Sequence, residues 1–278
     1  MLFFFLAVAL AQPQDPLPPD ARLVVLGGSV AETVCALGAC ERIVAADASS
    51  TAPEELQLRA NLGFHRQISA EGVLSVRPDV VLASPESGPP ESLKQVERAG
   101  VRVVQVPGDA TAEGSLDRIR FLGQLLGAPA KAHELTADLE SRLQSVRERV
   151  EGSERPRVLF IYARGGGTMM VAGRSTAAGE LIELAGGQNA VRGYEGYKPL
   201  TAEAVVMARP DVVLLTTGGL EVMGGARALW QTPGLAQTPA SKDKRLIAVE
   251  DLLLLGFGPR LAEAVETVAR GLHPERIR

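Results

Sequence analysis

Two segments of this chain are almost the same sequence. Residues 68–84 read ISAEGVLSVRPDVVLAS, and residues 200–216 read LTAEAVVMARPDVVLLT. Nine of the seventeen aligned positions are identical, at a constant offset of 132 residues (203 − 71 = 132). Such self-similarity normally marks repeated architecture, but this spacing is far too long for a solenoid. We therefore expect two similar lobes, and the cleft between two lobes is a common place for a small ligand.

Length and composition agree with two globular lobes. The chain has 278 residues, of which 46% are hydrophobic and 22% charged, which is enough for two cores. Its formal net charge is −4 and it contains no long basic run. The sequence therefore carries no electrostatic sign of nucleic-acid binding.

The first residues resemble an export signal. The apolar stretch from Leu2 to Ala11 is too short to span a bilayer, and Ala9-Leu10-Ala11 fits a small-x-small cleavage site. We expect a signal peptide over residues 1–11, a Pro-rich segment over 12–20 and a periplasmic location. A buried first strand is the alternative, because the positive charge that usually begins a signal peptide is missing. No Cys stands at the cleavage point to carry a lipid anchor.

Apolar runs alternate with helical segments through the first part of the chain, residues 21–110, which we expect to form an N-terminal α/β lobe. The runs that predict buried strands cover residues 22–26, 43–46, 80–83 and 101–106. Helices are expected over 30–37 and after Ser69, whereas 51–64 is polar and irregular. This order predicts a parallel sheet with helices on both faces.

Residues 111–152 are expected to be a helical linker, broken near Gly127-Ala128-Pro129. The apolar stripe of its second helix is Leu135, Leu139, Leu143 and Val146. Such a helix predicts a stiff strut and small lobe motion. A C-terminal α/β lobe is then expected over residues 153–278, with strands at 158–162, 212–216 and 245–249 and helices at 176–184 and 259–272.

Two cysteines, Cys35 and Cys40, lie near the end of the first expected helix. They can pair if Gly38 turns the chain between them, and two reduced thiols are the alternative. Their spacing fits neither a zinc knuckle nor a CxxC redox motif.

The sequence shows no catalytic set. Its three histidines, His65, His133 and His273, have no metalloenzyme spacing with acidic residues, and it has no nucleophile elbow. The runs Gly27-Gly28 and Gly165-Gly166-Gly167 follow expected strands but lack the phosphate-binding fingerprints, so they indicate tight turns or a close approach to a ligand. A binding protein is favoured over an enzyme.

Each copy of the repeat places a glutamate in the first turn of a helix. These are Glu71 and Glu203. The helix dipole stabilises an acidic side chain there, which explains each glutamate alone but not their matched positions. We expect one acidic contact per lobe for arginines of a symmetric partner.

Five stretches carry a family resemblance: ALGA (36–39), GFHRQISAEGVLSVRPDVVLAS (63–84), GGGTMMVAGRSTAAGELIELAGGQNA (165–190), GYKPLTAEAVV (196–206) and DLLLLGFGPR (251–260). The chain resembles the substrate-binding protein of haem ABC importers, within the class that binds cobalamin and ferric siderophores. The resemblance implies a class III periplasmic binding protein: two Rossmann-like lobes with parallel sheets, joined by a long rigid helix. It further implies haem as transported ligand, and Glu71 and Glu203 as contacts for the permease dimer, which works with a cytoplasmic ATPase.

One position departs from the family pattern. The haem family usually has Gly-Tyr where this chain has Gly63-Phe64, and that tyrosine ligates iron. A phenyl ring offers iron no lone pair, so Phe64 can only pack on a porphyrin face. Imidazole is a common axial ligand, which makes His65 the candidate iron ligand. Adjacent residues of an extended segment point to opposite sides, so His65 needs a turn to face the ligand.

Further ligand contacts are predicted from residue type. Arg66, Arg174 and Arg260 can hold the haem propionates in bidentate fashion. The other candidate iron ligands are Tyr197, Met169, Met170 and Tyr194, since methionine is a known haem ligand type. The alternative for each of them is a side chain that only lines the cleft.

Two other functions remain open. The same fold can carry a corrinoid or a ferric siderophore, which the missing tyrosine favours. A haem-handling enzyme, such as a chelatase or an oxidoreductase, is the third hypothesis. The protein is expected to act as a monomer.

Overall fold

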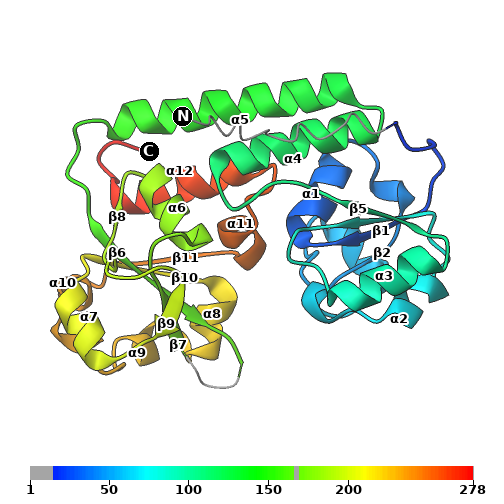
Figure 1. Cartoon of the computed structure of the whole chain (residues 1–278). Helices are drawn as coiled ribbons and strands as arrows, with labels where there is room; N and C mark the ends of the chain where they lie inside the picture. The colour runs from blue at the N-terminus through cyan, green and yellow to red at the C-terminus, as the bar shows by residue number, and fades with distance from the viewer. Residues whose placement is uncertain (1–14, 166–168, 278) are drawn as a thin grey trace, which may run out of the picture.

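The computed structural model describes residues 15–165 and 169–277. The predicted signal peptide, residues 1–11, lies outside the described residues, as do Gly166 and Gly167. Two α/β lobes lie beneath one long helix, α5 (Pro129–Val150), as Figure 1 shows. Within the described ranges, no helix is both long and apolar enough to cross a bilayer.

The N-terminal lobe is built on a parallel sheet of five strands in the order β3-β2-β1-β4-β5. The strands are β1 (Leu23–Leu26), β2 (Ile43–Ala46), β3 (Ala60–Asn61), β4 (Val80–Ala83) and β5 (Arg102–Gln105). Along β1, Leu23 and Val25 belong to one hydrophobic cluster, and Val24 and Leu26 to another. Successive side chains of a strand point to opposite faces, so both faces of this sheet are covered.

Helices and 3-10 turns cover the two faces and the edge of this sheet. They are α1 (Gly28–Ala36), α2 (Ala70–Ser75), α3 (Pro90–Arg98), η1 (Cys40–Arg42), η2 (Glu54–Leu58) and η3 (His65–Gln67). The segment 51–64, predicted to be irregular, contains η2 and the edge strand β3. Helix α3 was not predicted, although Pro90 stands at its first turn and Leu93 and Val96 are its buried residues.

Helix α4 (Ala112–Leu125) and α5 form the predicted linker, and the break falls at residues 126–128 as expected. Proline suits the first turn of a helix, and α5 begins at Pro129. In its apolar stripe Leu139 and Val146 are buried, and the other two leucines pack partly buried against the same core. The last helix, α12 (Leu261–Leu272), packs against α5, where Arg142 donates two hydrogen bonds to Glu266, at 3.1 and 2.9 Å.

The C-terminal lobe has a mixed sheet in the order β11-β10-β6-β7-β9, with β8 paired to β6. Its strands are β6 (Arg157–Ala163), β7 (Met169–Ala172), β8 (Gln188–Asn189), β9 (Tyr197–Pro199), β10 (Val212–Thr216) and β11 (Leu246–Val249). The other elements are α6 (Ala177–Leu184), α7 (Ala202–Ala208), α8 (Thr217–Val222), α9 (Gly225–Leu229), η4 (Leu235–Gln237), α10 (Pro239–Lys242) and α11 (Asp251–Leu255). The α/β class is as predicted, but β7 runs antiparallel to both β6 and β9, so this sheet is not parallel throughout.

The internal repeat has a structural cause. In both lobes its aspartate accepts a hydrogen bond from the backbone N–H at the start of the neighbouring strand: Arg22 donates to Asp79 at 2.7 Å, and Arg157 donates to Asp211 at 2.8 Å. Ser69 and Thr201 cap the two matching helices, α2 and α7. The two copies therefore make the same hydrogen bonds to the backbone in each lobe.

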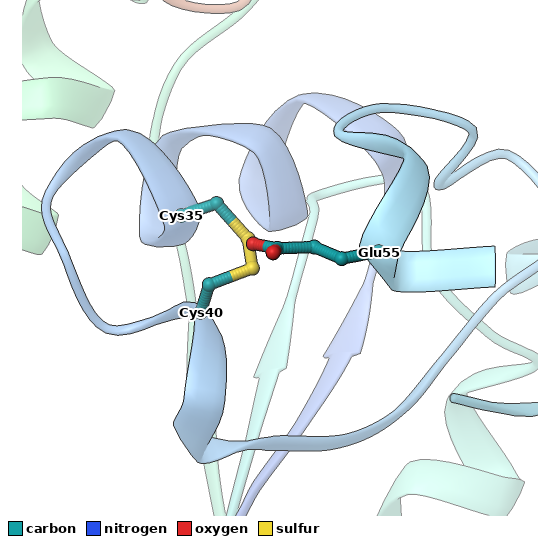
Figure 2. A group of neighbouring side chains, drawn as sticks. All are labelled: Cys35, Cys40 and Glu55. Atoms are coloured by element: carbon teal, nitrogen blue, oxygen red, sulfur yellow. A yellow bond between two sulfur atoms is a disulfide. The ribbon is translucent and has the colours of Figure 1, made fainter. Parts of the chain in front are cut away.

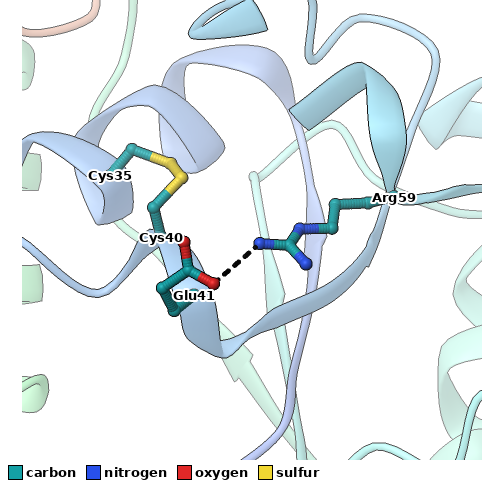
Figure 3. The surroundings of a disulfide bond; sticks show 4 residues. All are labelled: Cys35, Cys40, Glu41 and Arg59. Carbon is teal, nitrogen blue, oxygen red and sulfur yellow. Dashed lines mark hydrogen bonds and ion pairs between the residues drawn. A yellow bond between two sulfur atoms is a disulfide. The ribbon is translucent and has the colours of Figure 1, made fainter. Parts of the chain in front are cut away.

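The two cysteines form a disulfide, which decides between the two alternatives left by the sequence. The bond ties the end of α1 to η1, and Gly38, with φ of 88°, turns the chain between them. Figure 2 shows the Glu55 carboxylate beside the two sulfurs, which are bonded to each other and so offer no thiolate to a metal. Next to the disulfide, Glu41 pairs with Arg59 at 3.3 Å, which links η1 to the end of η2 (Figure 3).

A turn of the C-terminal lobe is held by the linker helix α4. The backbone carbonyl of Phe257 accepts hydrogen bonds from Ser115 and Arg118, both at 2.7 Å. Arg118 is 4% exposed and also donates to the carbonyl of Gly108 at 2.8 Å. Burial lowers the pKa of Arg118 to about 10, still far above neutral pH, so the guanidinium stays charged. This buried tie supports the expectation of a stiff connection between the lobes.

Candidate functional site

The segment that carries Phe64 and His65 turns sharply. Gly63 has a φ of 78°, and the 3-10 turn η3 begins at His65. The ring centroids of Phe64 and His65 are 4.6 Å apart, so the two rings lie side by side rather than on opposite faces. In an extended segment His65 would point away from the side on which Phe64 lies. The turn removes this obstacle, because it brings the imidazole beside the phenyl ring.

His65 is held from behind by a buried carboxylate. Its Nδ1 lies 3.0 Å from Oδ2 of Asp47, whose side chain is fully buried at the end of β2. The same carboxylate accepts hydrogen bonds from the N–H groups of Gly27 and Ser49. Burial works to raise the pKa of this carboxyl, but the hydrogen bonds, that from His65 foremost, outweigh it and lower the pKa to about 2. The carboxylate is therefore ionised at neutral pH.

Phe64 also meets a cation from the opposite lobe. The guanidinium carbon of Arg164 lies 5.3 Å from the ring centroid of Phe64, and that of Arg66 lies 5.9 Å from it. Arg164 follows β6 directly, and its Nη1 donates to the hydroxyl of Tyr162 at 3.2 Å. Cations over aromatic faces are attracted by the ring quadrupole. Phe64 thus stands at the boundary where the two lobes face each other.

Tyr197 completes this boundary. Its ring centroid is 5.9 Å from that of Tyr162, and the charge of Arg66 acts on its hydroxyl from the other lobe. Desolvation raises the pKa of Tyr197 to about 12, with Tyr162 adding to the rise and Arg66 opposing it. We name Phe64, His65, Arg66, Tyr162, Arg164 and Tyr197 the inter-lobe cluster.

The two methionines of β7 face opposite ways. Met170 pairs with Tyr162, and side chains of directly paired residues share one face of a sheet. Met169 is one residue away, so it points to the other face, where it packs against the hydrophobic core of the C-terminal lobe. The register therefore brings Met170 to the face of the inter-lobe cluster, and places Met169 in the packing behind it.

The three arginines predicted to hold propionates all have acidic partners. Arg66 pairs with Glu86 and Arg260 with Glu32, and Arg174 lies 3.8 Å from Glu195. The pair of Arg260 joins the lobes, because Glu32 belongs to α1. Arg174 lines a cavity of about 540 Å³ together with Asp109 and Arg192, at α6.

Another cavity, of about 610 Å³, lies among α4, α5 and α6. Neither of these two cavities is lined by the rings of the inter-lobe cluster. Their walls carry several carboxylates, and a flat apolar macrocycle requires ring faces instead. The inter-lobe cluster is therefore the better candidate site.

Gly27 and Gly28, at the end of β1, let neighbouring segments approach the backbone closely in the same region. A Cβ on Gly28 would meet the carbonyl oxygen of Ser49 at 2.4 Å and Leu252 of the other lobe at 2.7 Å. Gly27 has a φ of 112°, and its N–H donates to Asp47 at 2.7 Å. The run makes a tight turn that lets three segments meet.

Glu71 and Glu203 are exposed, each in the first turn of its helix, α2 and α7. In Figure 1 both helices lie on the side of the lobes away from α5. The structure thus gives the two matched glutamates one accessible position per lobe.

Three residues of the site were not singled out from the sequence: Asp47, Tyr162 and Arg164. The sequence pattern could have indicated Tyr162 and Arg164. They stand two residues apart at the end of a predicted strand, which places them on one face just before a glycine run. For Asp47 the signal is weaker, since only its place after a buried strand marks it.

Two lobes, a stiff helical connection and a ring cluster at their boundary define a binding protein. The periplasmic binding protein family model matches residues 23–252, and the chain belongs to that family. The structure is similar to the periplasmic heme-binding protein RhuT from Roseiflexus sp. RS-1, with a TM-score of 0.86 and 39% identity over 91% of this chain and 98% of that one.

Two curated relatives are more distant. An uncharacterized ABC transporter substrate-binding lipoprotein, YvrC of Bacillus subtilis (strain 168), is 28% identical over 92% of this chain and 81% of its own length. A cobalamin-binding protein of Halobacterium salinarum (strain ATCC 29341 / DSM 671 / R1) is 27% identical over 92% of this chain and 70% of its own length.

Proposed function

We propose that this protein binds haem between its two lobes, outside the cytoplasm, and delivers it to an ABC importer. The observation that carries the proposal is the contact of Phe64 with Arg164 across the lobe boundary. It brings a flat apolar face and a cation from opposite lobes to one place. Haem presents the matching chemistry, an apolar macrocycle with two carboxylates at one edge. The similarity to a heme-binding protein at 39% identity supports the same ligand.

Phe64 and Tyr197 are proposed to cover the macrocycle, with Tyr162 beside them. Met169 was the predicted methionine contact, and the register favours its neighbour Met170 for the same role. Burial of apolar macrocycle surface contributes about 25 cal/mol per Å² before ordering costs are subtracted.

Arg164 is proposed to receive a propionate. Among the described residues it is paired with no acidic side chain, whereas Arg66, Arg174 and Arg260 are. Those three arginines stay proposed contacts that must exchange a protein carboxylate for a propionate. Arg260 would in addition have to release Glu32 and so loosen a link between the lobes.

His65 is the proposed iron ligand. Its Nδ1 is occupied by Asp47, which leaves Nε2 to coordinate. Tyr197, on β9 of the opposite lobe, is the second candidate, because a tyrosine oxygen can also hold haem iron.

The test of ligand identity is a titration of the mature protein with ferric haem, followed by absorption spectroscopy. A saturable one-to-one complex is expected. The variant Arg164→Ala should weaken binding by roughly 10–150-fold, since a hydrogen bond to a charged group contributes about 1.5–3 kcal/mol. The matched control is Arg98→Ala, which removes an exposed guanidinium that pairs with Glu91 on α3. A titration without saturation would refute haem as the ligand.

Glu71 and Glu203 are proposed to contact the permease, one from each lobe. Replacing both by alanine should abolish haem uptake in cells and leave haem affinity within about twofold, because both side chains are exposed and lie on helices outside the inter-lobe cluster. The control is Glu97→Ala, which removes an exposed carboxylate from α3. Loss of haem affinity in the double variant would contradict the docking role.

Cobalamin is the second candidate ligand. Two observations favour it: the relative from Halobacterium salinarum is a cobalamin-binding protein, and Phe64 stands where haem proteins of this class usually have tyrosine. Calorimetric titration with cyanocobalamin distinguishes the two. Saturable cobalamin binding together with no haem binding would favour this function.

A further inference from the structure

The buried carboxylate of Asp47 has more hydrogen-bond partners than a carboxylate on the surface. Its Oδ1 accepts from the N–H of Gly27 at 2.7 Å and from the hydroxyl of Ser50 at 3.1 Å. Its Oδ2 accepts from the N–H and the hydroxyl of Ser49, at 2.9 and 2.6 Å, and faces Nδ1 of His65 at 3.0 Å. The segments that supply these partners leave the carboxylate no freedom to rotate.

The contact with His65 decides which ring nitrogen carries the proton. Each carboxylate oxygen of Asp47 already accepts two hydrogen bonds, from Gly27 and Ser50 on Oδ1 and from Ser49 on Oδ2, so it faces His65 as an acceptor and Nδ1 is the donor. In the neutral imidazole the lone pair then belongs to Nε2. A histidine without such a partner exchanges between its two tautomers, and only one of them presents Nε2 to a metal.

Nε2 is open to a ligand. Among the described residues it has no hydrogen-bond partner, and it is not one of the buried side-chain atoms left without one. The ring of Phe64 stands beside the imidazole at 4.6 Å, and Arg164 reaches that phenyl ring from the opposite lobe. The free nitrogen therefore belongs to the inter-lobe cluster.

We propose that Asp47 is the positioning residue of the iron site: it holds His65 by Nδ1–H and presents Nε2 as the axial donor. This inference rests on the proposed haem-binding function. A carboxylate behind a metal-binding imidazole fixes the ring and makes the donor nitrogen more basic. The pair would thus supply, in a chain with Phe64 at the usual tyrosine position, a strong and oriented donor for ferric iron.

The first test needs no haem. In ¹⁵N-labelled haem-free protein, at a pH where the rings are neutral, His65 is expected to show a protonated Nδ1 and an unprotonated Nε2. The signals are assigned with His65→Ala, since the chain has two other histidines. In Asp47→Asn the tautomers should mix or reverse. A predominantly Nε2-protonated His65 in the wild type would overturn the proposal.

The second test measures the loaded protein. Asp47→Asn should weaken ferric haem binding by about 10–100-fold, the usual loss on removing such an outer partner. It should also raise the Fe(III)/Fe(II) potential, because the donor becomes less basic. The matched control is Asp79→Asn, which removes a carboxylate that accepts a backbone N–H in the same lobe but lies outside the inter-lobe cluster. If Asp47→Asn and Asp79→Asn lose haem affinity equally and the Fe(III)/Fe(II) potential does not change, Asp47 has only a structural role.

The third test removes the imidazole. In a His65→Tyr background, Asp47 has no Nδ1 to hold, so adding Asp47→Asn should change haem affinity by less than about twofold while any loss of folding stability persists. A 10–100-fold loss in this background would overturn the proposal. If wild-type protein binds no haem, the proposed function fails, and the tautomer measurement still decides whether Asp47 orients His65.

Discussion

Gly28 lies where α1, the loop after β2 and helix α11 of the other lobe meet. A methyl group at this position would lie 2.4 Å from the backbone oxygen of Ser49 and 2.7 Å from Cδ1 of Leu252. Favourable separations of heavy atoms are about 3.5–4.0 Å, so Gly28→Ala requires a displacement of about 1 Å. Because Ser49 meets it with backbone, the adjustment cannot be made by a side-chain rotation alone.

The expected cost follows from these distances. Overpacking a filled site typically costs about 1–3 kcal/mol, and the better helix propensity of alanine returns at most about 1 kcal/mol. Gly28→Ala should therefore destabilise the protein by about 1–2 kcal/mol, or roughly 2–4 °C in Tm for each kcal/mol. Haem affinity should also fall, because Ser49 hydrogen-bonds Asp47 and Leu252 belongs to the opposite lobe.

Gly72→Ala is the matched control. Gly72 lies within α2, and the nearest atoms to an added Cβ are Ser69 Cβ at 3.8 Å and Leu62 Cδ2 at 3.9 Å. Without a clash, the change should stabilise by up to about 1 kcal/mol. The same chemical substitution thus has opposite signs at the two positions.

Urea unfolding monitors both variants, with circular dichroism for the whole chain and fluorescence of the single tryptophan, Trp230, for the C-terminal lobe. Coincidence of the two transitions tests whether the lobes unfold together. A Gly28→Ala protein as stable as the wild type would refute the steric argument. Equal destabilisation by Gly72→Ala would show that backbone entropy, rather than contact distance, decides the outcome.

Three further predictions concern stability. Leu139→Ala, at a residue 1% exposed under α5, should cost about 2–5 kcal/mol in urea unfolding, and a cost below 1 kcal/mol would contradict its place in the core. Burial raises the pKa of Glu32 above 4.5 despite Arg260, so the folded state binds this proton more tightly, and stability should fall as pH rises from 4.5 through the raised pKa. Glu32→Gln should remove that fall, and an unchanged pH profile would refute this origin. Replacing Cys35 and Cys40 together by serine should cost about 2 kcal/mol, because the closed loop is short; a thermal melt measures this, and an equal loss in reduced wild type confirms the cause.

Local pattern predicted the central strands well. The runs at 43–46, 80–83 and 212–216 coincide with β2, β4 and β10, because strands buried on both faces are continuous apolar segments. The linker helices were equally predictable from their stripe and their break at Pro129. The strands β3, β7 and β9 were not predicted. The edge strands β3 and β9 are only two and three residues long, and β7 is a four-residue apolar strand between β6 and β9, so the positions of all three depend on pairing with a neighbour.

The candidate site was predictable only in part. Phe64 and His65 were recognised by their place in the sequence, but their orientation depends on the turn at Gly63, which reverses the expectation for an extended chain. The three arginines were chosen by residue type, and the structure gives each an acidic partner. The residue type alone cannot reveal such a partner, because the acidic side chain comes from a distant segment for Arg66 and Arg260.

The sequence by itself determined the two lobes, their linker and the matched glutamates, because these follow from periodicity and from a repeat of local backbone contacts. Tertiary structure alone decided that Asp47 holds His65 and that Arg164 reaches Phe64 from the other lobe. The physical reason is the separation along the sequence of the residues that each feature joins. Helix and strand patterns repeat within a few residues, whereas a site at a lobe boundary joins side chains that only the packing of the whole chain brings together.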